Sequence, residues 1–132
     1  MLHFLRMYVG KAQNNLGRAF ARQENFDRAI VHYNKALEID PDFANVYYNL
    51  GNVFLRRGEL NEAIKHYIKA LDLAPDLPEA HLNLGNALLK QGKIEEAIAY
   101  YNKAIKLRPN YREALQNLQV AQSLKSQVET QP

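Results

Sequence analysis

The residues whose type and spacing best suit them to chemistry are four asparagines spaced 34 residues apart: Asn15, Asn49, Asn83 and Asn117. Asparagine is a poor residue for a helix interior because its side chain competes for backbone hydrogen bonds. Its amide carries both a donor and an acceptor, as a peptide bond does. A row of such amides could pair with the backbone of an extended ligand. The other interpretation is repeat consensus, in which the amides tie neighbouring units together or face water.

The sequence offers little for catalysis or metal binding. His32 and His66 are 34 residues apart, so they share one position in successive units and do not form the i, i+4 pair of a metal site. The other histidines are His81, in place of a large packing residue, and His3, in an irregular start. There is no phosphate-binding loop and no Gly-x-Ser-x-Gly motif. We therefore predict a non-enzymatic chain with no catalytic residue, no bound metal and no cofactor.

Composition and charge argue against nucleic acids and membranes as partners. The chain has 132 residues, 47% hydrophobic and 23% charged, which suits one domain with a continuous core. The formal net charge is +3, but acids and bases are interleaved, so we expect no nucleic-acid partner. No stretch approaches the ~20 apolar residues of a membrane span, and no signal peptide is recognisable. With no cysteine either, we expect no membrane insertion and a cytoplasmic location.

The tripeptide Asn-Leu-Gly recurs with the same period, beginning at residues 15, 49 and 83. A fixed period of this size indicates a stacked helical-repeat array, in which each unit contacts only its neighbours. The predicted segments are a helical extension or remnant of a preceding repeat at 1–9, units at 10–43, 44–77 and 78–111, a capping helix at 112–126 and a disordered tail at 127–132.

Each unit reads as two helices. The first helix is predicted to stop at Gly58 in unit two and Gly92 in unit three, because glycine adopts the left-handed conformation that commonly ends a helix. Unit one has Glu24 at that place, so we expect its turn to be looser or differently shaped. The second helices are predicted to open near Asp27, Asn61 and Glu95 and to stop before Pro41, Pro75 and Pro109. Seven helices are expected.

A glycine recurs in the middle of each first helix, at Gly17, Gly51 and Gly85. A glycine in a helix interior costs ~1 kcal/mol relative to alanine. Its presence at the same place in three units indicates that a side chain there would hold the helix pair apart. We therefore predict a packing role for these glycines.

These positions resemble the tetratricopeptide repeat family, and the resemblance covers residues 10–111. Unit two carries the family pattern as Tyr47, Leu50, Gly51 and Phe54, then Ala63, Tyr67, Ala70 and Pro75. The resemblance implies an all-α, right-handed superhelical array of helix-turn-helix repeats with a C-terminal capping helix. It also implies a non-catalytic protein–protein interaction scaffold, whose first helices line a concave groove that binds an extended peptide or a partner helix.

The resemblance assigns ten residues to the concave, peptide-binding face: Asn15, Arg18, Tyr48, Asn49, Asn52, Arg56, Asn83, Asn86, Lys90 and Asn117. The asparagine row is similar to the one in the repeat region of O-linked N-acetylglucosamine transferases. The chaperone-binding branch of the family grips a C-terminal carboxylate with cations, but here Glu79 or Glu113 falls at such a place, so that clamp is not expected. The basic groove residues indicate either an acidic ligand or a solvated edge.

Three hypotheses for function remain open from the sequence. The first is a protein or peptide-binding scaffold. The second is a substrate-recruiting region of a larger enzyme such as a glycosyltransferase, for which the apolar start would suit a fragment. The third is a homo-oligomer formed by stacking of the terminal helices. The identity of the partner cannot be derived from the residues.

Overall fold

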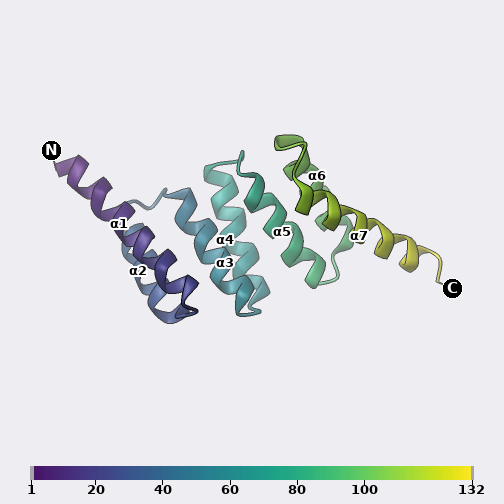
Figure 1. Cartoon of the computed structure of the whole chain (residues 1–132), viewed down its shortest axis with the longest axis horizontal. Helices are drawn as coiled ribbons and strands as arrows, with labels where there is room; N and C mark the ends of the chain where they lie inside the picture. The colour runs from purple at the N-terminus through teal and green to yellow at the C-terminus, as the bar shows by residue number, and fades with distance from the viewer. Residues whose placement is uncertain (1, 132) are drawn as a thin grey trace.

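A computed structural model describes residues 2–131, which form seven α-helices and no strand. The helices are α1 (Leu2–Arg22), α2 (Phe26–Ile39), α3 (Ala44–Arg56), α4 (Leu60–Leu73), α5 (Pro78–Lys90), α6 (Ile94–Leu107) and α7 (Arg112–Glu129). They follow one another along a single axis, and the two ends of the chain lie at opposite ends of the array (Figure 1). The predicted all-α helical-repeat array with a final helix is confirmed.

Each helix packs mainly on its neighbours in sequence. The pairs α1–α2, α3–α4 and α5–α6 make the closest associations, and α2–α3, α4–α5 and α6–α7 join one pair to the next. Smaller contacts join α1 to α3, α3 to α5 and α5 to α7. The first helices therefore lie side by side and form one continuous face of the array, which we call the groove face.

A tyrosine on each second helix forms the centre of each unit's core. Tyr33, Tyr67 and Tyr101 are almost completely buried, at 2%, 0% and 0% exposure. They are surrounded by small, fully buried alanines of the same helices, such as Ala63 and Ala70. Aromatic side chains bury more area than any other type and dominate core energetics.

The mid-helix glycines are in contact with these tyrosine rings. A Cβ atom added at Gly17, Gly51 or Gly85 would lie 2.5, 2.6 or 2.7 Å from the nearest carbon of the tyrosine ring in the same unit. Real Cβ atoms essentially never come so close, so the helix pair could not keep its separation. The packing role predicted for these glycines agrees with this geometry.

The turn inside each unit has one shape in all three units, so the expectation of a different turn at Glu24 is wrong. Gly58 and Gly92 have φ angles of 76° and 80°, and Glu24 has a φ of 60°. In each case the next residue's amide donates to a carbonyl in the last turn of the first helix, as Asn25 does to Phe20 at 2.9 Å. Glu24 adopts the left-handed conformation despite its side chain.

The second helices begin slightly earlier than predicted. The residues expected to cap them, such as Asp27, lie inside the first turn, and the capping positions are Asn25, Glu59 and Lys93. Only Asn25 of these three makes a side-chain capping bond, accepting from the Arg28 amide at 3.3 Å. The left-handed residue turns the chain so sharply that the next helix starts two residues later.

The terminal helices extend past the repeats. Residues 2–9 are helical and continuous with the rest of α1, and Met1 lies outside the described residues. The last helix runs to Glu129, beyond the predicted end at 126, so residues 127–129 are helical rather than part of a tail; Pro132 lies outside the described residues. Apolar side chains stay exposed at both ends, for example Phe4 at 68% and Val128 at 62%. Self-association through these ends stays a prediction.

The glycine–tyrosine contact predicts opposite effects for two glycine-to-alanine changes in helices. Gly51→Ala should lower the free energy of unfolding by about 1–3 kcal/mol, because the new methyl group overpacks the Tyr67 ring. Gly10→Ala should be neutral or raise it by up to ~1 kcal/mol, because alanine is the better helix former and its Cβ meets Ile39 at an ordinary 3.5 Å. Urea denaturation followed by circular dichroism measures both. Equal destabilisation by the two changes would contradict the packing role.

Candidate functional site

Three asparagines of the predicted row donate hydrogen bonds across the boundaries between units. The pairs, donor first, are Asn49 with Asn14 at 2.8 Å, Asn83 with Asn52 at 3.0 Å, and Asn117 with Asn86 at 2.9 Å. Every acceptor is an amide oxygen on the preceding first helix. The row therefore links α1 to α3, α3 to α5 and α5 to α7 along the groove face.

The choice of acceptor follows from what the preceding helix offers. Each donating asparagine faces two positions, one turn apart, on the preceding first helix. These two positions are occupied by Asn14 and Arg18 on α1, by Tyr48 and Asn52 on α3, and by Leu82 and Asn86 on α5. A guanidinium can only donate and leucine cannot accept. Asn49 and Asn117 therefore each use the single asparagine within reach, whereas Asn83 donates to both Asn52 and the Tyr48 hydroxyl, the latter at 3.2 Å.

The buried tyrosines join the same network. The Tyr67 hydroxyl donates to Asn52 Oδ1 at 2.6 Å, and the Tyr101 hydroxyl donates to Asn86 Oδ1 at 2.7 Å. Burial raises the pKa of Tyr67 strongly and that of Tyr101 to about 12, so both hydroxyls keep their protons. Each of the two asparagine oxygens thus accepts one bond from its own unit and one from the next.

These bonds leave specific amide groups for a ligand. The amide nitrogen of Asn52 lies beside the Tyr48 hydroxyl and has a second hydrogen to offer, and Asn86 Nδ2 makes only a long 3.5 Å bond to Asn83. Within residues 2–131, the amide oxygen of Asn49 accepts no bond. Both a donor and an acceptor therefore remain for pairing with a peptide backbone.

One asparagine of the predicted row lies outside this network. Asn15 is exposed, and no unit of the described chain precedes it to accept its bond. Its neighbour Asn14 is only 8% exposed and takes part in its place, as the acceptor for Asn49. The equal spacing identified Asn15 as the first member of the row, but the first unit can only accept.

A basic hollow of about 350 Å³ lies on the groove face between the first two units. Its polar walls come from the predicted residues Arg18, Asn49, Asn52, Arg56 and Asn83, together with Arg22 and Tyr33. Arg56 is fixed in place, because it donates to the Ala21 carbonyl at 3.0 Å and pairs with Glu24 at 3.2 Å.

A second hollow of about 220 Å³ lies further along the same face. Its lining residues are Leu55, Asn86, Leu89, Lys90, Tyr101, Asn117 and Val120. Leu55 also borders the basic hollow, so the two hollows share a wall. Leu82 is buried in the core at 2% exposure, and Tyr48 belongs to the hydrogen-bond network, so neither residue lines this hollow.

The groove face has an acidic edge as well. Burial by itself would raise the pKa of Glu79, but a backbone hydrogen bond together with the hydrogen bond and the charge of Arg108 outweighs it and holds that pKa below its usual value. The pKa of the nearby Tyr48 is raised, chiefly by burial and also by the charges of Glu79 and Glu113. A carboxylate ligand would be repelled at this edge.

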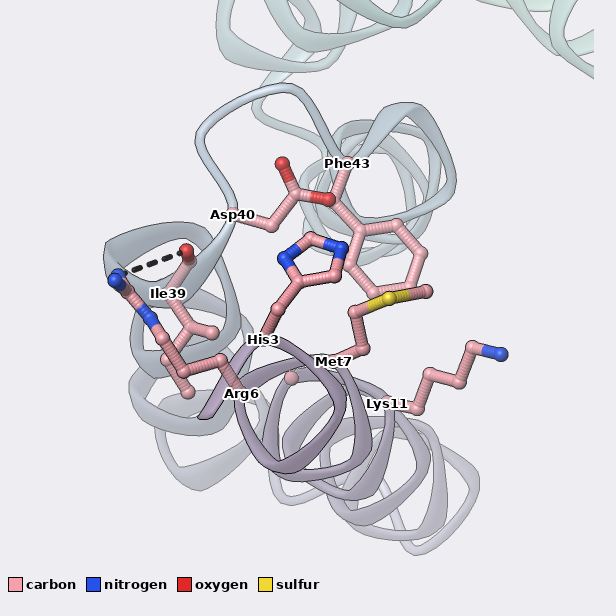
Figure 2. A pocket seen from close by; sticks show the side chains of 8 residues that line it. His3, Arg6, Met7, Lys11, Ile39, Asp40 and Phe43 are labelled. Carbon is pink, nitrogen blue, oxygen red and sulfur yellow. Dashed lines mark hydrogen bonds between the residues drawn. The ribbon is translucent and has the colours of Figure 1, made fainter. Parts of the chain in front are cut away.

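A larger hollow, of about 460 Å³, lies at the N-terminal end of the array (Figure 2). Its walls come from the first turns of α1, the end of α2 and the link to α3, and the one hydrogen bond across it joins Arg6 to the Ile39 carbonyl at 3.5 Å. No member of the asparagine–tyrosine network lines it, so it is separate from the candidate site.

Three of the histidines have structural partners, and His3 lies on the wall of the N-terminal hollow. His32 is hydrogen-bonded to Gln13 at 2.7 Å, and His66 and His81 bond backbone carbonyls at 2.7 and 2.8 Å. Residues 2–131 contain no group of three or more histidine, aspartate or glutamate side chains placed to hold a metal ion. No helix in that range is long and apolar enough to span a membrane.

Sequence reasoning missed the tyrosine hydroxyls as parts of the site. The family pattern predicts a packing role for the Tyr67 ring and assigns no role to its hydroxyl. The signal was present, since a buried tyrosine hydroxyl needs a hydrogen-bond partner and Asn52 and Asn86 recur at the same spacing as their donors.

The network predicts unequal effects for one chemical change in two units. Tyr67→Phe should lower the free energy of unfolding by about 1 kcal/mol, because the bond to Asn52 is lost. Tyr33→Phe should change it by less than about 0.5 kcal/mol, because the structure gives the Tyr33 hydroxyl no bond within residues 2–131. Denaturant unfolding of both variants tests this, and equal losses would argue against the network.

Comparisons with known proteins identify the repeats. The model of the TPR repeat matches residues 17–58 and 51–92, and the model of the tetratricopeptide repeat matches residues 78–111. No curated protein sequence matches the chain significantly.

Solved structures share the fold. The first TPR of Spaghetti (RPAP3) bound to an HSP90 peptide is 24% identical with a TM-score of 0.87, covering 90% of this chain and 94% of that one. The N-terminal domain of the stress-induced protein STI-1 from C. elegans is 23% identical with a TM-score of 0.78, covering 89% of this chain and 97% of that one.

One similar structure is an enzyme. The O-GlcNAc transferase of Thermobaculum terrenum is 28% identical over 88% of this chain with a TM-score of 0.82, but this chain spans only 22% of its length. The family models together cover residues 17–111, well over half of the sequence. The chain belongs to the tetratricopeptide repeat family.

Proposed function

We propose that the groove face binds an extended peptide segment of a protein partner and that the asparagine row pairs with the peptide backbone. The observation that carries this proposal is the set of amide groups left over by the network. Asn52 and Asn86 are held by two acceptor bonds each and keep donor hydrogens beside the two hollows. Backbone pairing of this kind tolerates many ligand side chains.

Pre-organisation supports the proposal. A side chain that is already fixed loses little conformational freedom on binding, so more of its interaction energy appears as affinity. The Asn52 oxygen accepts one bond from the Tyr67 hydroxyl and one from the Asn83 amide. The Asn86 oxygen accepts in the same way from the Tyr101 hydroxyl and the Asn117 amide. The same asparagines therefore tie the units together and present amides to a ligand, so the two interpretations of the row are compatible.

Related structures support a scaffold role in the broad sense. The Spaghetti (RPAP3) repeat has been solved bound to an HSP90 peptide. That ligand does not transfer directly to this chain, because Glu79 and Glu113 occupy the acidic edge of the groove face.

A second candidate function is substrate recruitment within a larger enzyme. It is favoured by the 28% identity to the Thermobaculum terrenum O-GlcNAc transferase, whose length this chain spans only in part. The groove would then hold a peptide segment of a protein substrate. Both candidates use the same groove face and differ in what lies beyond the repeats.

Selection from a library of displayed peptides tests the proposal. Peptides that bind the native chain should lose at least about tenfold in affinity, or ~1.4 kcal/mol, on the Asn49→Ala, Asn83→Ala double variant. The physical reason is that this variant removes the Asn49 oxygen left for the ligand and also the Asn83 amide that holds Asn52 in place.

The double variant also loses links between units, so a control of matched stability is needed. Val46→Ala weakens the fold through the core, where Val46 is fully buried, while keeping every groove asparagine and its hydrogen bonds. It should retain binding to within about threefold, with helicity and melting temperature measured for both variants. Binding that survives the double asparagine change would overturn the proposal.

A further inference from the structure

Unit one differs from the other two units at the first-helix position that supplies a hydrogen-bond acceptor for the buried tyrosine. Asn52 and Asn86 accept the hydroxyl protons of Tyr67 and Tyr101. The equivalent residue on α1 is Arg18, which has no acceptor atom. No residue in the described range accepts from the Tyr33 hydroxyl, although this tyrosine is as deeply buried as the others, at 2% exposure.

The Tyr33 hydroxyl lies on the wall of the basic hollow together with cationic side chains. Burial raises the pKa of Tyr33 to about 12, and the charges of Arg18 and Arg22 act in the opposite direction. The hydroxyl therefore keeps its proton near neutral pH and offers it to the hollow. The hydroxyl is open to water at the hollow, and an oxygen atom of a ligand can replace that water as its acceptor.

The charges around the hollow all have one sign. Its ten lining residues include Arg18, Arg22 and Arg56 and no carboxylate. Arg56 is engaged with Glu24 outside the hollow, but Arg18 and Arg22 form no ion pair with any residue from 2 to 131. Unpaired guanidinium groups beside a free hydroxyl are complementary to an oxyanion, because the guanidinium groups carry positive charge and all of these groups can donate hydrogen bonds.

Helix-dipole compensation explains only part of this arrangement. Arg22, Arg56 and Lys90 lie in the last turns of α1, α3 and α5, where a positive charge is favourable in any such helix. Arg18 lies a full turn earlier and replaces the asparagine that the other units use. Its charge beside Tyr33 is therefore particular to this hollow.

We propose that the hollow between units one and two binds an anionic side chain of the peptide, an aspartate, glutamate or phosphorylated residue, through Arg18, Arg22 and the Tyr33 hydroxyl. The neighbouring hollow shares Leu55 as a wall and adds Leu89 and Val120, so it accepts an aliphatic residue of the same peptide. This inference rests on the proposed function, because the peptide must lie along the groove face to reach both hollows.

The peptide selection is repeated with the Arg18→Gln, Arg22→Gln double variant, whose two side chains are exposed and whose helicity should be unchanged. Peptides enriched on the native chain should be rich in acidic residues and should lose at least about tenfold in affinity on this variant. The matched control is Lys35→Gln, Lys106→Gln, which removes the same charge from exposed positions on second helices and should change affinity by less than about twofold.

A second measurement isolates the hydroxyl. Tyr33→Phe should weaken binding of an enriched acidic peptide by about threefold or more while leaving the melting temperature unchanged. Synthetic peptides with an amidated C-terminus, carrying aspartate, phosphoserine or serine at the selected position, distinguish the source of the negative charge. Binding that requires a free C-terminal carboxylate instead would overturn the assignment to a side chain.

The outcomes separate this inference from the proposed function. Peptides that lose affinity on the asparagine variant but not on the arginine variant, and that show no acidic preference, would overturn the anion site and leave the groove proposal standing. Peptides insensitive to the asparagine variant would overturn the groove proposal. A selection that enriches no peptide would overturn both.

Discussion

The close contact between a mid-helix glycine and a buried tyrosine ring is the constraint on which the rest of this structure depends. Because Gly51 has no side chain, the Tyr67 ring can lie directly against the backbone of α3, and the two helices approach closely. Interiors at crystal-like density do not deform continuously, so a ring held on all sides has one position. That position carries the hydroxyl to a fixed point at the groove face, and the same construction recurs in each unit.

The fixed hydroxyl determines which side chains are stable on the groove face. Asparagine in a helix interior is unfavourable by itself, yet Asn52 receives the Tyr67 proton from its own unit and the Asn83 amide from the next. One oxygen atom thus couples packing within a unit to the alignment between units. Hydrogen bonds in a connected network polarise one another. A polar row that would weaken an isolated helix therefore strengthens the array.

The sequence predicted the parts of the fold that depend on one unit and missed those that depend on two. Periodicity and glycine placement gave seven helices and the role of Gly51, because packing within a unit repeats with the chain. The spacing could not show that Asn49 reaches back to Asn14, since that depends on how far one unit is rotated against the next. The turn at Glu24 was missed for another reason, because surrounding helix packing imposes a left-handed conformation that propensity alone disfavours.

The first unit shows how a repeat can depart from its pattern without losing the array. Arg18 removes the acceptor that Asn52 provides in the next unit, and the link to α3 would be lost if Asn49 had no alternative. Asn14, one turn earlier, supplies it at 2.8 Å, at a place that holds Tyr48 in unit two and leucine in unit three. The structural link has moved by one turn. The position that no longer takes part in the link carries the positive charge of Arg18 beside the Tyr33 hydroxyl, which has no acceptor within residues 2–131. Packing alone does not require this arrangement.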